Sequence, residues 1–306
     1  MEITKDQQQL DRMDSGESTP ELESLPIVFV GGGNMASAII RGCLKNQFIP
    51  AEQIVIGVKS KKSEEKWRSK GFENVFTNTQ QMLENYPTAI YVMCVKPQLF
   101  DEVVSSWPVN ARPRIFISIM ASITLGQIRE KIPFLSQYTT MVRLMPNMAS
   151  SIGCSATSMC YEDYGIDEQN VHIEYSKRFA ECIGSVELIP ERCFNAATAV
   201  AASSPAWVFM FIEALADGAV HQGLGRLEAK RMAANAVMGA AKMLTTLESG
   251  FDIEREHVGL LKDQVCSPSG TTIEGVRSLE RHGFRSAVME AVIEASSRAE
   301  TMSKPK

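Results

Sequence analysis

The feature that most constrains the fold is a glycine-rich turn between a short apolar run and a helical pattern. Residues 27–30 read Ile-Val-Phe-Val, residues 31–33 are three glycines, and apolar residues with helical spacing follow. A buried strand, a tight turn and a helix open a dinucleotide-binding βαβ unit. Gly31 would make the turn, Gly33 would admit a pyrophosphate close to the backbone, and Ala36 is small enough for helix–strand packing. We therefore expect a Rossmann-like domain at this end of the chain.

Further apolar runs repeat the pattern, with helical segments between them. They cover residues 53–58, 89–95, 115–119, 140–147 and 185–189. Strands that alternate with helices predict a mostly parallel sheet with helices on both faces. Ligands of such sheets bind beyond the carboxyl ends of the strands. The segments expected along that crevice are residues 31–35, 94–97, 118–122 and 146–147.

The residues after the second predicted strand bear on the choice of cofactor. An NAD site usually has Asp or Glu there for the ribose hydroxyls, whereas this chain has Lys59-Ser60-Lys61-Lys62. The missing acid and the nearby basic and hydroxyl groups favour the 2′-phosphate of NADP. The alternative is a solvated charge run that opens the helix containing Trp67. Lys96, beside Pro97 at another strand end, is either a surface charge or a cofactor contact.

The character of the chain changes after Pro190. Residues 192–247 are rich in Ala, Met and Leu with helical spacing. Residues 203–205, Ser-Ser-Pro, are expected to break or kink the first helix, because proline removes an intrahelical hydrogen bond. The predicted domains are an acidic disordered tail (1–25), an α/β dinucleotide-binding domain (26–190) and an all-α substrate and dimerisation domain (191–306). The Ala and Met surfaces indicate contact with a second subunit, with packing inside the chain as the alternative.

Composition excludes several other classes of protein. A net charge of -5 without a long basic block gives little support to a nucleic-acid or membrane partner. The polar, acidic first 25 residues resemble neither a transit peptide nor a secretory signal, and no uninterrupted apolar stretch approaches membrane-spanning length. Seven scattered cysteines and four histidines indicate reduced, mostly buried thiols and no metal site. We expect a soluble cytoplasmic protein, with a mitochondrial location as the less favoured alternative, and hydride transfer rather than hydrolysis.

A second segment rich in Ser, Pro and Gly lies near the C-terminal end of the helical half. Residues 267–270, Ser-Pro-Ser-Gly, predict a turn, and Thr271 or Thr272 opens the next helix. Unpaired backbone N–H groups at such a helix start attract a carboxylate or a phosphate. The segment is therefore either an anion site or a plain connection between helices.

The order and spacing of five segments resemble those of pyrroline-5-carboxylate reductases. These segments are residues 28–36, 95–97, 203–206, 213–218 and 261–272. The resemblance extends from Pro26 to about Arg298. It implies NAD(P)H-dependent reduction of 1-pyrroline-5-carboxylate to L-proline and a Rossmann domain followed by a helical dimerisation domain. It also implies a homodimer, which in this family often assembles into a decamer.

The same resemblance assigns residues to the site. The cofactor, NADPH with NADH as the alternative, would contact Gly31, Gly32, Gly33, Asn34, Met35, Lys59 or Ser60, Asn78, Cys94, Val95, Lys96 and Pro97. The substrate carboxylate would be held by Ser267, Gly270, Thr271 and Thr272. Thr272 would lie near the ring nitrogen as a positioning group, because a hydroxyl is a poor acid at neutral pH. Glu248 is a candidate for anchoring a water molecule.

Three departures from the family pattern keep other functions open. The chain has Met120-Ala121-Ser122 where relatives commonly have Ala-Ala-Gly, Asn147-Met148-Ala149 where they have Asn-Thr-Pro, and Trp207 where Tyr is usual. We expect these positions near the nicotinamide or the dimer contact. The alternatives are a reductase of another cyclic imine or keto acid, and a non-catalytic NADP-binding regulatory protein.

Overall fold

The computed structural model describes residues 19–133, 135–136, 139–163, 165, 167–246 and 249–303. The chain divides into two compact units. Of the described residues, those up to Ala202 and from Ser296 onward form the first unit, and Ser203–Ala295 form the second.

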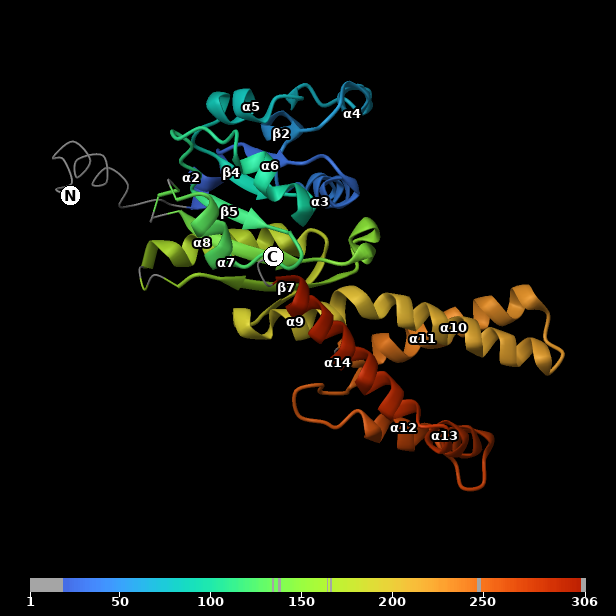
Figure 1. Cartoon of the computed structure of the whole chain (residues 1–306). Helices are drawn as coiled ribbons and strands as arrows, with labels where there is room; N and C mark the ends of the chain where they lie inside the picture. Colours follow the sequence, from blue (N-terminus) through green and yellow to red (C-terminus); the bar gives the residue numbers. More distant parts are fainter. Residues whose placement is uncertain are drawn as a thin grey trace. The chain divides into compact units, whose positions relative to one another are not determined.

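The first unit is built on an eight-stranded sheet with the order β3-β2-β1-β4-β5-β6-β7-β8. Figure 1 labels β2, β4, β5 and β7 of this sheet. The strands are β1 (Ile27–Val30), β2 (Ile54–Gly57), β3 (Val75–Phe76), β4 (Ile90–Met93), β5 (Ile115–Ser118), β6 (Thr140–Met145), β7 (Ser155–Tyr161) and β8 (Gly184–Leu188). Only the β6–β7 pair is antiparallel in this sheet. The strand order reverses direction between β1 and β4, which is the point where doubly wound sheets bind ligands. The predicted mostly parallel sheet is confirmed.

Two of these strands were not predicted. β3 has two residues, too few to be recognised as an apolar run. β7 has the sequence Ser-Ala-Thr-Ser-Met-Cys-Tyr, which is too polar to resemble a buried strand, yet most of it is buried between β6 and β8. Its hydroxyl groups are accommodated by hydrogen bonds, such as the one from Thr157 Oγ1 to Ser155 Oγ at 3.0 Å.

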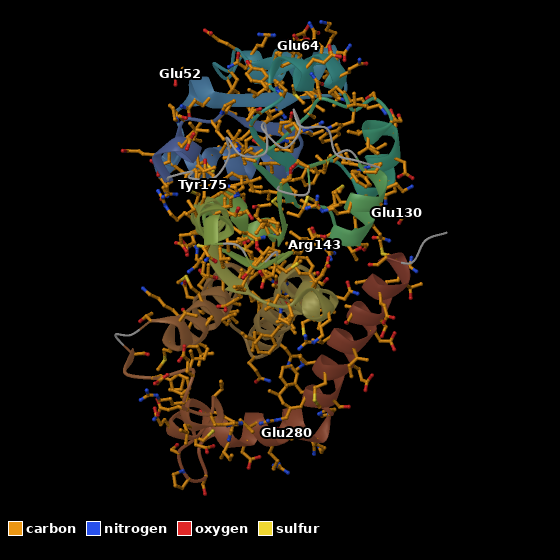
Figure 2. All side chains as sticks on the ribbon, turned by 90° about the vertical axis from the view of Figure 1, so that its left-hand side faces the viewer. Glu52, Glu64, Glu130, Arg143, Tyr175 and Glu280 are labelled. Carbon is orange, nitrogen blue, oxygen red and sulfur yellow. The ribbon has the colours of Figure 1, made fainter. Side chains whose placement is uncertain are left out.

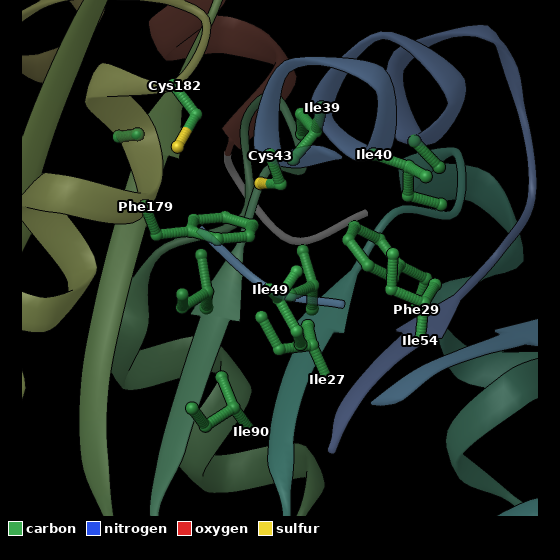
Figure 3. Packing of buried hydrophobic residues seen from close by; sticks show 14 of the residues in the cluster. Ile27, Phe29, Ile39, Ile40, Cys43, Ile49, Ile54, Ile90, Phe179 and Cys182 are labelled. Carbon is green, nitrogen blue, oxygen red and sulfur yellow. The ribbon is translucent and has the colours of Figure 1, made fainter. Parts of the chain in front are cut away.

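Helices cover both faces of the sheet. Those of the first unit are α2 (Thr19–Glu23), α3 (Asn34–Lys45), α4 (Lys61–Arg68), α5 (Thr79–Asn85), α6 (Phe100–Val104), α7 (Leu125–Lys131), α8 (Asp167–Glu181) and α9 (Phe194–Ala197). The short 3-10 helices are η1 (Ala51–Gln53), η2 (Pro97–Leu99), η3 (Met148–Ile152) and η4 (Glu191–Cys193). Ile27 and Phe29 of β1 pack with α3 and α8 on one face (Figure 3), and Val28 and Val30 pack with α5, α6 and α7 on the other. Strands buried on both faces explain the continuous apolar runs in the sequence.

The acidic N-terminal segment is more ordered than expected where the structure describes it. Disorder was predicted for all of residues 1–25, but Thr19–Glu23 forms α2. Leu22 is fully buried in the core beneath α3 and α8, and Glu23 pairs with Arg178 at 3.1 Å. One buried leucine anchors a segment whose composition alone indicated a tail, so this part of the prediction is wrong.

A partly buried ion pair connects the sheet with η4, which follows the last strand. Arg143 of β6 is 2% exposed (Figure 2), and its Nη1 donates to Glu191 Oε1 at 3.2 Å. The same carboxylate oxygen accepts from Leu125 N–H, and the guanidinium lies over the Phe194 ring at 4.0 Å. Burial lowers the pKa of Arg143, and the Glu191 carboxylate opposes that shift. β6, α7 and η4 are thus held together at one point.

The second unit is helical. Its helices are α10 (Ser204–His221), α11 (Arg226–Thr245), α12 (Gly259–Val265), α13 (Thr271–Arg281) and most of α14 (Phe284–Ser303). A π-helix, η5 (Thr198–Ser203), leads into α10, whose first turn contains Pro205. The change of helix type lies beside the predicted break at residues 203–205. α10 packs on α11 through a small cluster of alanines, Ala216, Ala229 and Ala233.

Much of the apolar surface of this unit is exposed. Phe209, Met210, Leu227 and Met232 are each more than half exposed. Packing inside the chain therefore does not use these side chains, and a second subunit remains as the explanation that the sequence suggested. Within the described residues, one helix, Glu191–His221, is long and apolar enough to cross a membrane by length and composition only, and 11% of its apolar 18-residue window is buried. The prediction was that no uninterrupted apolar stretch approaches membrane-spanning length, whereas this helix reaches that length with a mean hydropathy of 1.5 over the window.

Candidate active site

A cavity of about 540 Å³ lies at the carboxyl ends of β1 and β2, at the switch point of the sheet. Its walls come from the glycine turn, the end of β2, the β3–α5 turn, the segment after β4, and α6. The lining residues are Val30, Gly31, Gly32, Gly33, Gly57, Val58, Lys59, Ser63, Thr77, Asn78, Thr79, Val95, Leu99, Glu102, Val103 and Ser106.

The glycine turn has the geometry that a pyrophosphate requires. Gly31 has a φ of +108°, and a Cβ on it would lie 3.0 Å from the carbonyl carbon and oxygen of Cys94. Both the backbone angle and the close approach of β4 therefore demand glycine. Gly33 is the N-cap of α3, and a Cβ there would meet nothing within 4 Å. The space in front of Gly33 and the N-terminus of α3 fits a phosphate group.

Gly32 has a structural role that the motif does not require. The dinucleotide fingerprint tolerates any residue at this position. In this chain a Cβ on Gly32 would lie 2.6 Å from Trp67 Nε1 and 2.7 Å from a methyl of Val58. Trp67 Nε1 also donates to the Gly32 carbonyl at 3.1 Å. The Trp67 indole of α4 thus packs against the glycine turn and donates a hydrogen bond to it, which explains why a Trp is buried in an otherwise charged helix.

The far end of the cavity is polar. Lys59 Nζ donates to Glu102 Oε1 at 3.1 Å and to Oε2 at 3.4 Å. Asn78 Oδ1 caps α5 by accepting from Gln81 N–H at 3.0 Å. Hydroxyl groups of Ser63 and of the residues around Asn78 complete this wall. The end of β2 therefore presents a cation and hydroxyl groups, as expected for the phosphorylated ribose of NADP.

The structure places about half of the predicted cofactor residues on the cavity wall. Gly31, Gly32, Gly33, Lys59, Asn78 and Val95 line it, and Asn34, Met35, Ser60, Cys94, Lys96 and Pro97 are not part of the lining. Ser60 caps α4 by accepting from Ser63 N–H, and the Cys94 backbone supports Gly31. Burial raises the pKa of the Cys94 thiol. Ser60 and Cys94 therefore act on the cavity indirectly, Ser60 by capping α4 and Cys94 through its backbone contact with Gly31.

Several lining residues were missed in the sequence. Thr77 and Thr79 flank Asn78 after β3, a strand too short to predict. Glu102 and Ser106 follow β4 on and after α6, far from the β2 end in the sequence. The one signal for the threonines is their position on either side of Asn78, which the family resemblance had indicated. Nothing local in the sequence indicates Glu102.

The ends of β5 and β6 continue the predicted crevice along the same edge of the sheet. Ser122 follows β5 with a φ of +63°, an uncommon angle for a residue with a side chain. The family resemblance places glycine at this position, and this backbone angle explains why. Asn147 follows β6 and is 7% exposed. Its Nδ2 donates to the Ala201 carbonyl at 2.8 Å, and its Oδ1 accepts from Ala149 N–H at 2.9 Å.

In the second unit, the predicted turn and helix start are present. Gly270 N–H donates to the Ser267 carbonyl at 3.1 Å, and α13 begins at Thr271 with Gly270 as an N-cap that offers no side-chain oxygen. A Cβ on Gly270 would lie 2.3 Å from Ser267 Oγ. Ser269 has a φ of +57°. The first N–H groups of α13, beside Thr272, are thus left without a side-chain cap, as an anion site needs.

Three further predictions concern Glu248, a metal site and the cysteines. Glu248, proposed to anchor a water molecule, lies outside the described residues. Among the residues that the structure does describe, no group of three His, Cys, Asp or Glu side chains is arranged to hold a metal ion. All seven cysteines are free, three of them buried, so the expected burial of most thiols is wrong.

The fold and the glycine turn define the class of protein as a Rossmann-type oxidoreductase that uses NADP. Comparison with known families supports that class, since residues 26–122 match the model described as NADP oxidoreductase, coenzyme F420-dependent. Residues 191–302 match the model of the pyrroline-5-carboxylate reductase dimerisation domain. The exposed apolar side chains of α10 and α11 fall within this second match, whose description as a dimerisation domain supports homo-oligomerisation.

Similar proteins identify the family. The chain is 64% identical over 283 residues to the putative pyrroline-5-carboxylate reductase 4 of Caenorhabditis elegans, covering 92% of this chain and 95% of that protein. It is 36% identical to the pyrroline-5-carboxylate reductase of Escherichia coli, covering 91% and 98%. The chain belongs to the pyrroline-5-carboxylate reductase family.

Solved structures agree with this assignment. A pyrroline-5-carboxylate reductase from Coxiella burnetii superposes with a TM-score of 0.76 at 26% identity, covering 92% of this chain and all of that one. The Plasmodium falciparum pyrroline carboxylate reductase with NADP bound gives 0.75 at 25% identity, with the same coverage. The resemblance seen in the sequence is confirmed.

Proposed function

We propose that this chain reduces 1-pyrroline-5-carboxylate to L-proline with NADPH. The observation that carries the proposal is a pair of sites in a member of this family. The first unit has an open glycine turn at Gly33 for a dinucleotide, and the second has an uncapped helix start at Thr271 for an anion. A hydride donor and a carboxylate-bearing acceptor are the two ligands that the reaction brings together.

The chemistry assigns a task to each group of residues. NADPH supplies a hydride when bound. The hydride adds to the carbon of the C=N bond of the protonated imine, the C=N π electrons become the lone pair of nitrogen, and the proton already on nitrogen stays there to give the secondary amine. Gly33 and the N-terminus of α3 hold the pyrophosphate, and Lys59 holds the 2′-phosphate. These contacts fix the donor so that the acceptor can be presented in a reactive orientation.

The substrate side is held by the 267–272 turn. The N–H groups that open α13 bind the carboxylate, and the Thr272 hydroxyl orients the ring nitrogen. The substrate's own carboxylate, which lies beside that nitrogen, favours the protonated imine, and this form accepts hydride more readily. Thr272 is a positioning group, and the imine proton comes from the protonated substrate itself.

The exposed apolar side chains and the free cysteines bear on the assembly and the location of the protein. We propose a homodimer built on the helical unit that associates further into a decamer. The exposed Met and Leu side chains of α10 and α11 support extensive subunit contact. Seven free cysteines support a reducing compartment, for which we propose the cytoplasm.

The test is oxidation of NADPH and of NADH by the purified chain with 1-pyrroline-5-carboxylate, compared with a six-membered cyclic imine and a keto acid. The proposal requires the highest kcat/KM for pyrroline-5-carboxylate. A higher value for another substrate, or cofactor binding without turnover of any imine, would overturn it. Thr272→Ala should lower kcat/KM about 10- to 100-fold with folding retained. Thr245→Ala, an exposed threonine at the end of α11, serves as the matched control.

A further inference from the structure

An ion pair forms part of the cavity wall at the end of β2. Lys59 Nζ lies 3.1 Å and 3.4 Å from the two carboxylate oxygens of Glu102. Lys59 follows β2, whereas Glu102 lies on α6, and both side chains line the cavity. The pair thus brings a carboxylate from a different element to the place where NAD-binding proteins have one at the end of β2.

Lys59 and Glu102 are also the charged residues of this wall. Among the described residues that line the cavity, Lys59 is the one basic side chain and Glu102 the one acidic side chain. The remaining polar groups near them are neutral hydroxyl and amide groups. The net charge of the described side chains that line the cavity is therefore zero rather than positive.

The pair can open at low cost. The side chains of Lys59 and Glu102 are 75% and 64% exposed, and an ion pair in that environment contributes little stability. A 2′-phosphate that approaches Lys59 competes with Glu102 for the ammonium group and is repelled by the carboxylate. A ribose 2′-hydroxyl has the opposite effect, because the carboxylate of Glu102 can accept its hydrogen bond.

We propose that Glu102 determines the cofactor specificity of this chain. It weakens selection for the 2′-phosphate by competing for Lys59, and it provides an acceptor for the ribose 2′-hydroxyl of NADH. The inference deepens the proposed function by naming the residue that sets the balance between NADPH and NADH. It concerns nucleotide binding alone and does not depend on the imine substrate.

Calorimetric titration of the full chain with two adenine nucleotides tests the proposal. Adenosine 2′,5′-bisphosphate and adenosine 5′-monophosphate differ only in the 2′-phosphate. Glu102→Gln should raise the affinity for the bisphosphate relative to the monophosphate by roughly three- to tenfold. Lys59→Gln should lower that ratio, and in its background Glu102→Gln should raise the ratio by less than it does with Lys59 present, because the competition for the ammonium group is then gone.

Asp101→Asn is the matched control. Asp101 is the neighbouring residue on α6, pairs with Lys131 at 3.0 Å and does not line the cavity, so the variant removes the same charge from the same helix. It should leave the ratio unchanged. An unchanged ratio in Glu102→Gln, or an equal change in Asp101→Asn, would overturn the proposal. A changed ratio in an enzyme that fails to reduce pyrroline-5-carboxylate would leave this proposal standing and sink the proposed function.

Discussion

Replacing Asn147 with alanine should destabilise the connection between the end of β6 and the helix that enters the second unit. Pro205 has no N–H, so where the π-helix η5 gives way to α10 it cannot donate an α-helical hydrogen bond to the carbonyl of Ala201, four residues earlier. Asn147 Nδ2 donates to that carbonyl at 2.8 Å in its place. The other end of the same amide accepts from Ala149 N–H at 2.9 Å and caps η3.

The expected magnitude follows from these two bonds. Asn147 is 7% exposed, so the groups that it leaves behind have little access to water. A typical hydrogen bond contributes about 0.5–1.5 kcal/mol, and a buried group without a partner costs about 1–3 kcal/mol. Asn147→Ala should therefore reduce the free energy of unfolding by roughly 2–3 kcal/mol, of which about 1 kcal/mol belongs to the Ala201 carbonyl.

A double-mutant cycle with Pro205→Ala measures the part of the Asn147→Ala effect on the free energy of unfolding that belongs to the Ala201 carbonyl. The alanine restores a backbone N–H that can reach the Ala201 carbonyl, so Asn147→Ala should cost about 1 kcal/mol less in the Pro205→Ala background. Urea unfolding followed by circular dichroism measures each free energy. Asn46→Ala is the matched control, because the Asn46 amide donates to Gly42 and Cys182 carbonyls elsewhere in the same unit. Its cost should be the same with either residue at 205.

The reasoning is refuted if Asn147→Ala costs the same in both backgrounds. It is equally refuted if the Asn46 control shows a coupling to position 205 as large as that of Asn147. Either result would mean that the amide does not replace the hydrogen bond that proline removes.

The remaining predictions concern the turns. Gly33→Ala should leave the free energy of unfolding nearly unchanged but raise the Kd for NADPH roughly tenfold or more, since its methyl enters the open space. Gly32→Ala should instead lower stability by about 1–3 kcal/mol, because its Cβ would lie 2.6 Å from Trp67 Nε1. Equal Kd effects in the two variants would contradict this division. Ser122→Gly should raise the stability by about 1 kcal/mol, and a lower Tm would count against strain at φ +63°. Gly270→Val should reduce kcat/KM more than Thr272→Ala does, because its Cβ would lie 2.3 Å from Ser267 Oγ; steady-state kinetics decide.

Much of the fold could be predicted because its signals are local. The apolar runs at β1, β4 and β5 mark strands buried on both faces, and the turn at Gly31 follows directly from a backbone angle that suits glycine. The predictions failed where neighbours in space override local composition. β7 has a polar sequence, yet it lies inside the sheet between β6 and β8. The acidic composition around Leu22 predicted a disordered tail, yet burial of Leu22 in the core orders this segment.

The residues of the candidate site also fall into those that the local sequence indicated and those that only the folded structure brought together. The sequence by itself determined the glycine turn, the lysine after β2 and the turn before α13, because each depends on residues that are adjacent in the chain. Only the tertiary structure decided three contacts. Gly32 packs on Trp67, Glu102 pairs with Lys59 at a separation of 43 residues, and the Asn147 amide donates to the Ala201 carbonyl at a separation of 54 residues. These contacts depend on which strand ends become neighbours, and that is settled by packing the whole sheet rather than by any stretch of sequence.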